Sequence, residues 1–250
     1  MIIDFQGQVV LITGATRGIG KQLADDFALL GANLILTGSN KELIEDLNRE
    51  GDLTKDSLKR YYAVDFTNQK SLDAFLNKIS SLAKIDVCIN NAGINKIDYI
   101  DETVIEDWEN IIAVNLEAPF KITRAVSKLM KKNNYGRIIN IASIWGVISK
   151  VKRSIYSVSK FGIRGLTVST ALDLAAYNIL VNSVSPGFVV TELTKRILGE
   201  EEMKKLAEQV PLGRFAMPDE ISKVILFLAS RHNTYITAQN IVVDGGFVNV

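Results

Sequence analysis

The chain has 250 residues, of which 47% are hydrophobic and 23% charged, the composition of a globular protein with a substantial core. Its 29 basic and 28 acidic residues almost cancel, which argues against a nucleic-acid-binding protein. The one cysteine, Cys88, cannot form an internal disulfide, and no apolar run reaches the length of about 20 residues that spans a membrane. The only histidine, His232, has no cysteine or histidine cluster around it. We therefore expect a cytoplasmic protein with no metal, no nucleic-acid partner and no membrane segment.

Short β-branched runs alternate with longer amphipathic segments along the whole chain. The predicted strands are Val9–Thr13, Asn33–Thr37, Tyr61–Asp65, Ile85–Asn90, Arg137–Ala142, Leu180–Ser185 and Gln239–Val243. The predicted helices are Ile19–Leu30, Lys41–Asn48, Asn68–Leu82, Val104–Lys132, Ser154–Tyr177 and Pro218–Ser230. Strands that are apolar throughout are typical of parallel strands covered on both faces. The pattern predicts an α/β fold, a single Rossmann-type domain over residues 1–250 with a doubly wound, seven-stranded parallel sheet and helices on both faces.

The alternation is interrupted between the sixth and seventh predicted strands. Residues 189–214 hold an additional polar helical stretch that includes residues 199–205. An insertion after the carboxyl end of a strand lies where ligands bind in open α/β sheets, so we expect a lid over the substrate. A solvated surface helix is the alternative interpretation.

A glycine-rich turn joins the first predicted strand to the first predicted helix. It reads Thr13-Gly14-Ala15-Thr16-Arg17-Gly18-Ile19-Gly20. Glycines allow a tight turn and let the backbone approach a pyrophosphate at a helix N-terminus, where free N–H groups favour anions. Such a turn alone is weak evidence, but its place in the first strand–helix unit strengthens it. The spacing Gly-x-x-x-Gly-x-Gly differs from the general dinucleotide-binding pattern.

Further motifs follow the later strands in a fixed order. They are Asn90-Asn91-Ala92-Gly93, Asn115, Ser143, Tyr156-Ser157-Val158-Ser159-Lys160, Pro186-Gly187 and Asp244-Gly245-Gly246. With the glycine turn, their order and spacing resemble the short-chain dehydrogenase/reductase family of the classical type, most of all its bacterial 3-oxoacyl-carrier-protein-reductase-like members. The resemblance implies an NAD(P)-dependent oxidoreductase, a ketoreductase acting on a small-molecule carbonyl or alcohol substrate. A catalytically inactive dinucleotide-binding sensor or scaffold is the alternative, and a Rossmann-like methyltransferase would have no use for Ser143, Tyr156 and Lys160 together.

Four residues are the candidate catalytic groups: Asn115, Ser143, Tyr156 and Lys160. Free tyrosine has a pKa of about 10, and an ammonium nearby favours the phenolate. Lys160 stands four residues after Tyr156, on the same face of a predicted helix. Ser143 follows a strand at the edge where ligands gather, and its hydroxyl suits a donor to the substrate oxygen. The resemblance implies that Asn115 positions a water for proton resupply.

The candidate cofactor contacts combine the glycine turn with the carboxyl ends of the other strands. They are Gly14, Arg17, Gly18, Ile19, Gly20, Ser39, Asn40, Asp65, Asn91, Ala92, Gly93, Tyr156, Lys160, Pro186, Gly187, Val189 and Thr191. No carboxylate follows the second predicted strand, where NAD-preferring members carry one, and Arg17 offers a charge-assisted contact to a 2′-phosphate. We expect NADP rather than NAD, although Ser39 stands where NADP-preferring members often carry arginine.

The substrate and the assembly are expectations of a coarser kind. The arginines with which carrier-protein-linked relatives dock their partner fall on Asn134 and Tyr177, so sugar, polyol, steroid and small-ketone substrates stay open. The loop before Tyr156 carries Lys150, Lys152 and Arg153 and no carboxylate, which suggests steering of an anionic substrate beside Trp145. By resemblance the two long helices, at residues 104–132 and 154–177, build an interface of a homotetramer.

Overall fold

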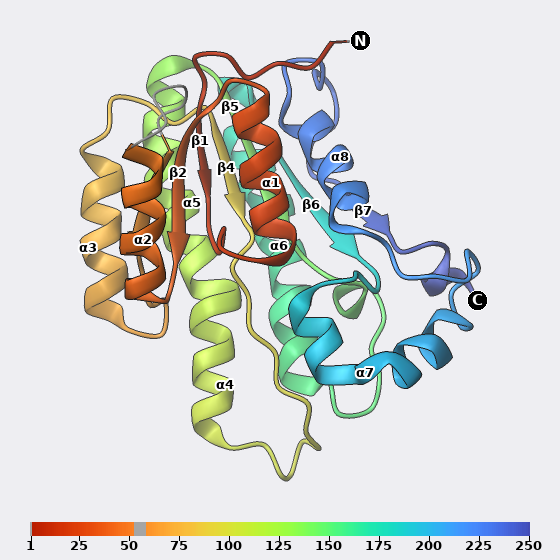
Figure 1. The fold of residues 1–250 in the computed structure, drawn as a ribbon. Coiled ribbons are helices and arrows are strands. Elements are labelled where there is room, and N and C mark those ends of the chain that lie inside the picture. Colours follow the sequence, from red (N-terminus) through yellow and green to blue (C-terminus); the bar gives the residue numbers. More distant parts are fainter. Residues whose placement is uncertain (1, 53–58) are drawn as a thin grey trace.

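Seven parallel strands form one sheet in the computed structural model, which describes residues 2–52 and 59–250 (Figure 1). Their order is β3-β2-β1-β4-β5-β6-β7, and all six pairings are parallel. The strands are β1 (Val9–Ile12), β2 (Asn33–Gly38), β3 (Lys59–Ala63), β4 (Val87–Asn90), β5 (Gly136–Ile141), β6 (Ile179–Pro186) and β7 (Asn240–Val243). The order reverses direction between β1 and β4, which is where doubly wound sheets bind their ligands. The predicted fold class is confirmed.

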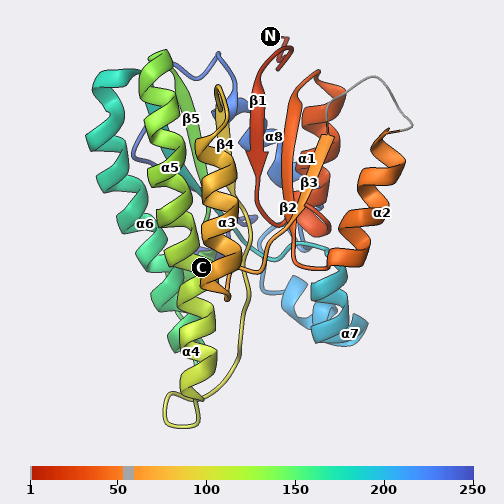
Figure 2. The same cartoon turned by 90° about the vertical axis from the view of Figure 1, so that its left-hand side faces the viewer.

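Two hydrophobic cores lie on opposite faces of this sheet. Helices α1 (Gly18–Leu29) and α8 (Pro218–Ala229) bury Phe27 and Ile225 on one face. Helices α3 (Gln69–Ser80), α5 (Ala118–Asn133) and α6 (Ser154–Leu174) cover the other face and lie together in Figure 2. Every residue of β5 and β6 is buried, including the polar Arg137 and Asn140, as expected of central strands covered on both sides. The remaining helix on the β2–β3 side is α2 (Lys41–Asp52).

A buried polar chain joins the sheet to the second helix layer. The Asn90 amide donates to the Thr123 hydroxyl (3.1 Å) and to Asn140 Oδ1 (2.8 Å). Asn140 in turn donates to the Thr167 hydroxyl of α6 (2.9 Å). Because buried amides without partners are costly, these contacts fix the positions of α5 and α6 on β4 and β5.

The predicted helix over residues 104–132 has a break in its helical geometry. It consists of α4 (Ile105–Ile112), a π-helical turn (Ala113–Glu117) and α5. Pattern analysis did not foresee this turn, because the helical period is the same on either side of one inserted residue and only the phase of the apolar stripe shifts. π-Turns inside α-helices are frequent at functional sites, and this one contains Asn115.

Residues 189–214 contain the predicted additional helix, α7 (Glu192–Ala207), which has a break at Gly199 with φ 69° and ψ 169°. Both α4 and α7 lie beyond the carboxyl ends of the strands, toward which the arrowheads point (Figure 1). Leu206 and Val210 are buried, so the insertion does not end as a freely solvated segment. Its role as a lid stays a prediction.

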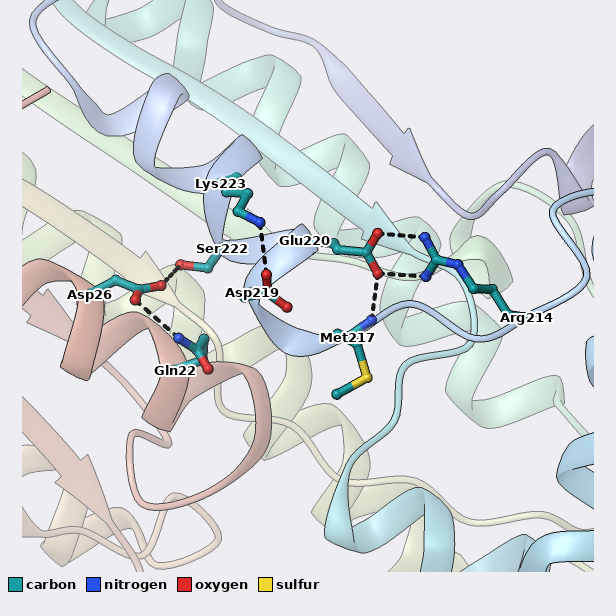
Figure 3. A network of polar contacts seen from close by, with 8 residues as sticks. All are labelled: Gln22, Asp26, Arg214, Met217, Asp219, Glu220, Ser222 and Lys223. Atoms are coloured by element: carbon teal, nitrogen blue, oxygen red, sulfur yellow. Dashed lines mark hydrogen bonds and ion pairs between the residues drawn. The ribbon is translucent and has the colours of Figure 1, made fainter. Parts of the chain in front are cut away.

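The end of the insertion is attached to α8 and through it to α1 (Figure 3). The Arg214 guanidinium donates to both carboxylate oxygens of Glu220, each at 2.7 Å, and Glu220 accepts from the Met217 backbone N–H at 2.8 Å. The Ser222 hydroxyl, on the buried side of α8, donates to Asp26 of α1 at 2.5 Å. Arg214, the last residue of the insertion, is therefore held on helix α8 by its ion pair with Glu220. No helix in the described ranges is long and apolar enough to cross a membrane.

Candidate functional site

The glycine turn follows β1 and meets the loop after β4. Gly14 has φ 66°, and its N–H donates to the Thr37 hydroxyl (3.1 Å). A Cβ at Gly14 would lie 2.9 Å from the Ala92 Cα, and a Cβ at Gly20 would lie 2.1 Å from the Gly14 carbonyl oxygen. Both positions therefore exclude a side chain, which leaves the backbone of the turn open toward the N-terminus of α1.

The loop after β4 is bonded directly to this turn. The Asn91 side chain donates to the carbonyls of Thr13 (2.9 Å) and Gly14 (3.0 Å). The Thr13 hydroxyl accepts the backbone N–H groups of Asn91 and Ala92, both at 3.0 Å. The predicted contacts Gly14, Asn91 and Ala92 thus form one rigid unit across β1 and β4.

The predicted contacts at the outer strands lie on the rim of this unit. Arg17 is exposed at the N-cap of α1, and Ser39 and Asn40 are exposed after β2. The Asn40 side chain accepts from the Leu43 N–H (3.0 Å), which caps α2. Asp65 is exposed and lies two residues beyond β3, where its Oδ1 accepts from the Thr67 N–H and hydroxyl (2.9 and 2.7 Å). Ile19 differs from these, because it is half-buried against the α1 core.

The residues after β6 approach the same turn from the other side. A Cβ at Gly187 would lie 2.8 Å from the Asp244 Cα, so Pro186-Gly187 packs on the loop after β7. Val189 is buried and pairs with Ala216. Thr191 caps α7 by accepting the Thr194 N–H (3.1 Å), and a Cβ at Gly18 would lie 3.3 Å from its methyl group. The start of the insertion therefore lies against the glycine turn.

Tyr156 and Lys160 occupy successive turns of α6, as their spacing predicts. The Lys160 ammonium nitrogen lies 5.6 Å from the centroid of the Tyr156 ring and donates to the Ile141 carbonyl (2.8 Å) at the end of β5. Lys160 is 4% exposed. Burial lowers the pKa of Lys160 to about 8, so this amine changes charge near neutral pH.

Asn115 connects the π-turn to both the loop after β4 and α6. Its Oδ1 accepts from the Ile94 N–H (2.8 Å), and its Nδ2 donates to the Ile94 carbonyl (2.9 Å) and the Ser159 hydroxyl (3.1 Å). A Cβ at Gly93 would lie 3.5 Å from Asn115 Oδ1 and 3.6 Å from Lys160 Nζ. Asn115 and Lys160 therefore flank Gly93. Ser159 was missed by the sequence analysis, and its position inside the Tyr-x-x-x-Lys motif was the available signal.

The charge environment of Tyr156 differs in part from the expectation. Burial raises the pKa of Tyr156, and a hydrogen bond with Ser143 and the charge of Arg153 lower it. We expected Lys160 to supply the lowering charge, whereas in this structure the cation that does so is Arg153. Sequence analysis had named Arg153 only as one of three cations on a loop.

An aromatic cluster lines the side of the site next to Ser143; sequence analysis had named its member Trp145 but not the three phenylalanines around it. Trp145 lies 6.2 Å from Phe247 and 6.5 Å from Phe188, measured between ring centroids. Phe188 stacks on Phe215 at 5.0 Å. These side chains come from the loop after β5, both ends of the insertion and the C-terminal segment. No sequence motif joins segments so far apart, so only the fold reveals them.

Known proteins resemble the chain over nearly its whole length. Residues 14–248 match the family described as enoyl-(acyl carrier protein) reductase. The chain is 39% identical to the 3-oxoacyl-[acyl-carrier-protein] reductase FabG of Aquifex aeolicus, over 98% of this chain and 99% of that protein. It is 36% identical to FabG of Rickettsia bellii over the full length of both.

Solved structures with the same fold carry other names. A putative NAD(P)-dependent gluconate 5-dehydrogenase from Beutenbergia cavernae with bound NADP has a TM-score of 0.91 at 28% identity and covers 99% of each chain. A gluconate 5-dehydrogenase from Burkholderia cenocepacia in complex with NADP and tartrate has a TM-score of 0.88 at 29% identity, covering 99% of this chain and 97% of that one.

The close packing at Gly20 predicts a stability effect. We expect Gly20→Ala to lower the free energy of unfolding by roughly 1–3 kcal/mol, because the methyl group forces the turn apart. Urea denaturation measures this. Lys21→Ala at the neighbouring exposed position removes only a surface ion pair and serves as the control. Equal stability of Gly20→Ala and the unaltered protein would contradict the assigned packing.

Proposed function

Because the chain belongs to the short-chain dehydrogenase/reductase family, we propose that it interconverts a ketone and a secondary alcohol with NADP(H), and that Tyr156 transfers the proton. The observation that carries the proposal is that Asn115 and Lys160 flank Gly93 while Lys160 Nζ lies 5.6 Å from the centroid of the Tyr156 ring. The cytoplasmic location expected from the single cysteine stays a prediction.

The residues present fit a dinucleotide. Positions 14 and 20 of the glycine turn have no room for a side chain. The backbone of this turn leads into the N-terminus of α1, whose N–H groups suit a pyrophosphate. NADP is favoured over NAD because exposed Arg17 stands at the N-cap while Ser39 and Asn40 leave no carboxylate after β2. Two of the similar solved structures also contain bound NADP. When bound, NADPH supplies the hydride for the carbonyl carbon.

The protein's own residues manage the oxygen and its proton. The Ser143 Oγ accepts the Trp145 N–H (3.2 Å), so its own hydrogen is available to the substrate oxygen or to Tyr156. Burial keeps the Tyr156 hydroxyl protonated near neutral pH, in the form that donates to the oxygen. Lys160 and Asn115 flank Gly93; Lys160 restores the proton to Tyr156 after transfer, and Asn115 positions a water that links Lys160 to solvent.

Removing the Tyr156 hydroxyl tests this proposal. We expect Tyr156→Phe to lower kcat by about 10²–10⁴-fold, the typical contribution of general acid catalysis, with NADPH affinity nearly unchanged. Absorbance at 340 nm with a panel of ketones gives kcat, and fluorescence titration gives the affinity. Tyr235→Phe, at a residue that is 96% exposed, is the matched control.

Two outcomes would reject the reaction. Tyr156→Phe with most of the activity of the unaltered protein would exclude Tyr156 as the proton donor. Tight NADPH binding by the unaltered protein without turnover of any ketone would favour the alternative, a dinucleotide-binding sensor or scaffold.

Cofactor preference depends on Arg17. We expect a higher kcat/KM with NADPH than with NADH, and Arg17→Ala to lower the NADPH value alone, because only NADPH carries the 2′-phosphate. Steady-state kinetics with both cofactors measures the ratio, and Arg60→Ala, an exposed position on β3, controls for loss of surface charge. A higher kcat/KM with NADH, or an equal effect of Arg17→Ala on both cofactors, would overturn the assignment.

We also propose the homotetramer implied by the family. Helix α6 exposes four large apolar side chains, and α5 exposes one: Val158, Phe161, Val168, Leu172 and Phe120. Exposed apolar side chains grouped on neighbouring helices are typical of a protein–protein interface. Gly165 lies on the same face of α6, and a Cβ there meets no atom within 4 Å in the single chain.

A larger side chain at position 165 should therefore leave the fold of one chain unchanged and prevent two chains from packing together at α6. We expect light scattering to give four times the chain mass of 27.6 kDa for the unaltered protein and a smaller mass for Gly165→Gln. Leu43→Gln, on α2, is the control. A monomeric unaltered protein, or a Gly165→Gln variant of unchanged mass, would contradict this interface.

A further inference from the structure

Arg153 is a half-buried cation at the edge of the proposed reaction centre. It is the residue before α6, and its guanidinium carbon lies 5.7 Å from the centroid of the Trp145 ring. Its charge acts on Tyr156, whose pKa it lowers. Arg153 therefore lies near both the proton donor and the aromatic side of the site.

No carboxylate pairs with Arg153 among the ion pairs of residues 2–52 and 59–250. Asp98 is bonded to the same loop through its backbone N–H, which donates to the Lys152 carbonyl (3.3 Å), but its Oδ1 accepts from the Tyr99 N–H (3.1 Å). Burial lowers the pKa of Arg153, because removing a cation from water costs free energy. A guanidinium stays charged nevertheless, so an anion would offset that cost.

The neighbouring Ser154 also lacks a partner. Its hydroxyl oxygen is buried and has no hydrogen-bond partner within the part of the chain that the structure describes. Ser154 is the first residue of α6, and no side chain caps this helix. Free N–H groups in the first turn of a helix favour an anion. The first turn of α6, which directly follows Arg153 in the chain, therefore has backbone N–H groups that favour an anion.

The other two cations of the loop are placed differently. Lys152 Nζ lies over the ring of Tyr99, 4.2 Å from its centroid, and Lys150 is exposed. The charge of Arg153, in contrast, lowers the pKa of Tyr156. Of the three cations of the loop, Arg153 is half-buried at the site, whereas Lys150 and Lys152 are exposed on the surface.

We propose that Arg153 binds a carboxylate or phosphate group of the substrate and so selects anionic ketones for the reaction proposed above. The inference rests on that proposed function for the identity of the reacting group. The overall change is oxo acid + NADPH + H⁺ → hydroxy acid + NADP⁺. The carbonyl carbon gains the hydride, its oxygen gains the proton of Tyr156, and the anionic group is unchanged.

Matched substrates test the selection. Acetoacetate is compared with methyl acetoacetate, and dihydroxyacetone phosphate with dihydroxyacetone, which separates a carboxylate preference from a phosphate preference. We expect Arg153→Gln to lower kcat/KM for the preferred anion by roughly 10–100-fold, mainly through KM, because a hydrogen-bonded charge contact is lost. Loss of the Arg153 charge also acts on Tyr156, but equally for both members of a pair, so the ratio of kcat/KM for the anion to kcat/KM for its neutral partner is the readout. Lys150→Gln should leave this ratio unchanged. A preference of the unaltered protein for both neutral compounds, or an equal effect of Arg153→Gln on both members of a pair, would overturn the inference.

A binding measurement makes the test independent of turnover. In a Trp108→Phe background Trp145 is the only remaining tryptophan, because the chain has two. We expect malonate or inorganic phosphate to change its fluorescence in a saturable way at constant ionic strength, and Arg153→Gln to abolish the change. Binding that survives Arg153→Gln, or no binding of either anion, would overturn the inference.

The two measurements also separate this inference from the proposed reaction. Anion binding through Arg153 without turnover of any ketone would reject the reaction and retain the anion site. Turnover of neutral ketones through Tyr156, with no anion preference, would retain the reaction and reject the role of Arg153.

Discussion

Asn115 holds the site together because its buried amide has to be satisfied on every side. An amide in an apolar helix costs free energy unless its oxygen and nitrogen both find partners. At 1% exposure, Asn115 accepts from and donates to the Ile94 backbone and also donates to Ser159. The π-turn that places it breaks the regular helix, and the hydrogen bonds offset that cost. The loop after β4 and helix α6 are therefore fixed to the same side chain.

Ser159 extends that constraint to the proton-transfer pair. Its hydroxyl accepts from Asn115 and donates to the Tyr156 carbonyl (2.7 Å), and Lys160 follows it directly in the helix. Burial then acts oppositely on the two titratable groups: it raises the pKa of Tyr156 and lowers that of Lys160. Near neutral pH the phenol is a proton donor while the amine is close to its titration point, as a relay between them requires.

Much of the fold could be predicted from the sequence, because the signals for its strands and its glycine turn lie within short segments of the chain. β5 and β6 are rich in Ile and Val and lack strict alternation of polar and apolar residues, which predicts central parallel strands. The glycine turn follows a strand and opens a helix. The π-turn at Asn115 was not predictable, because an apolar stripe has nearly the same period on either side of it. The first residues of β3, Lys59 and Arg60, were not assigned to a strand, because they are charged and the strand lies at the sheet edge.

The site was predictable where its residues form motifs and not where they meet only in space. Tyr156 and Lys160 are four residues apart and share a helix face, so their approach followed from spacing. Phe188, Phe215 and Phe247 come from three separate segments, and Arg153 became distinct from Lys150 and Lys152 only through burial. Such long-range contacts depend on tertiary packing, to which a single-sequence pattern gives no access.

The pH dependence of ketone reduction tests the relay most directly. The pKa of Lys160 is lowered to about 8, so its charged form is complete below that pH and is lost as the pH rises through it. If Lys160 restores the proton of Tyr156, kcat/KM for reduction with NADPH is constant near pH 6–7 and falls above about pH 8, toward tenfold for each further pH unit. The raised pKa of Tyr156 places its own loss of the proton at higher pH. A rate that stays constant through this range would show that the charge of Lys160 takes no part, and would contradict the account.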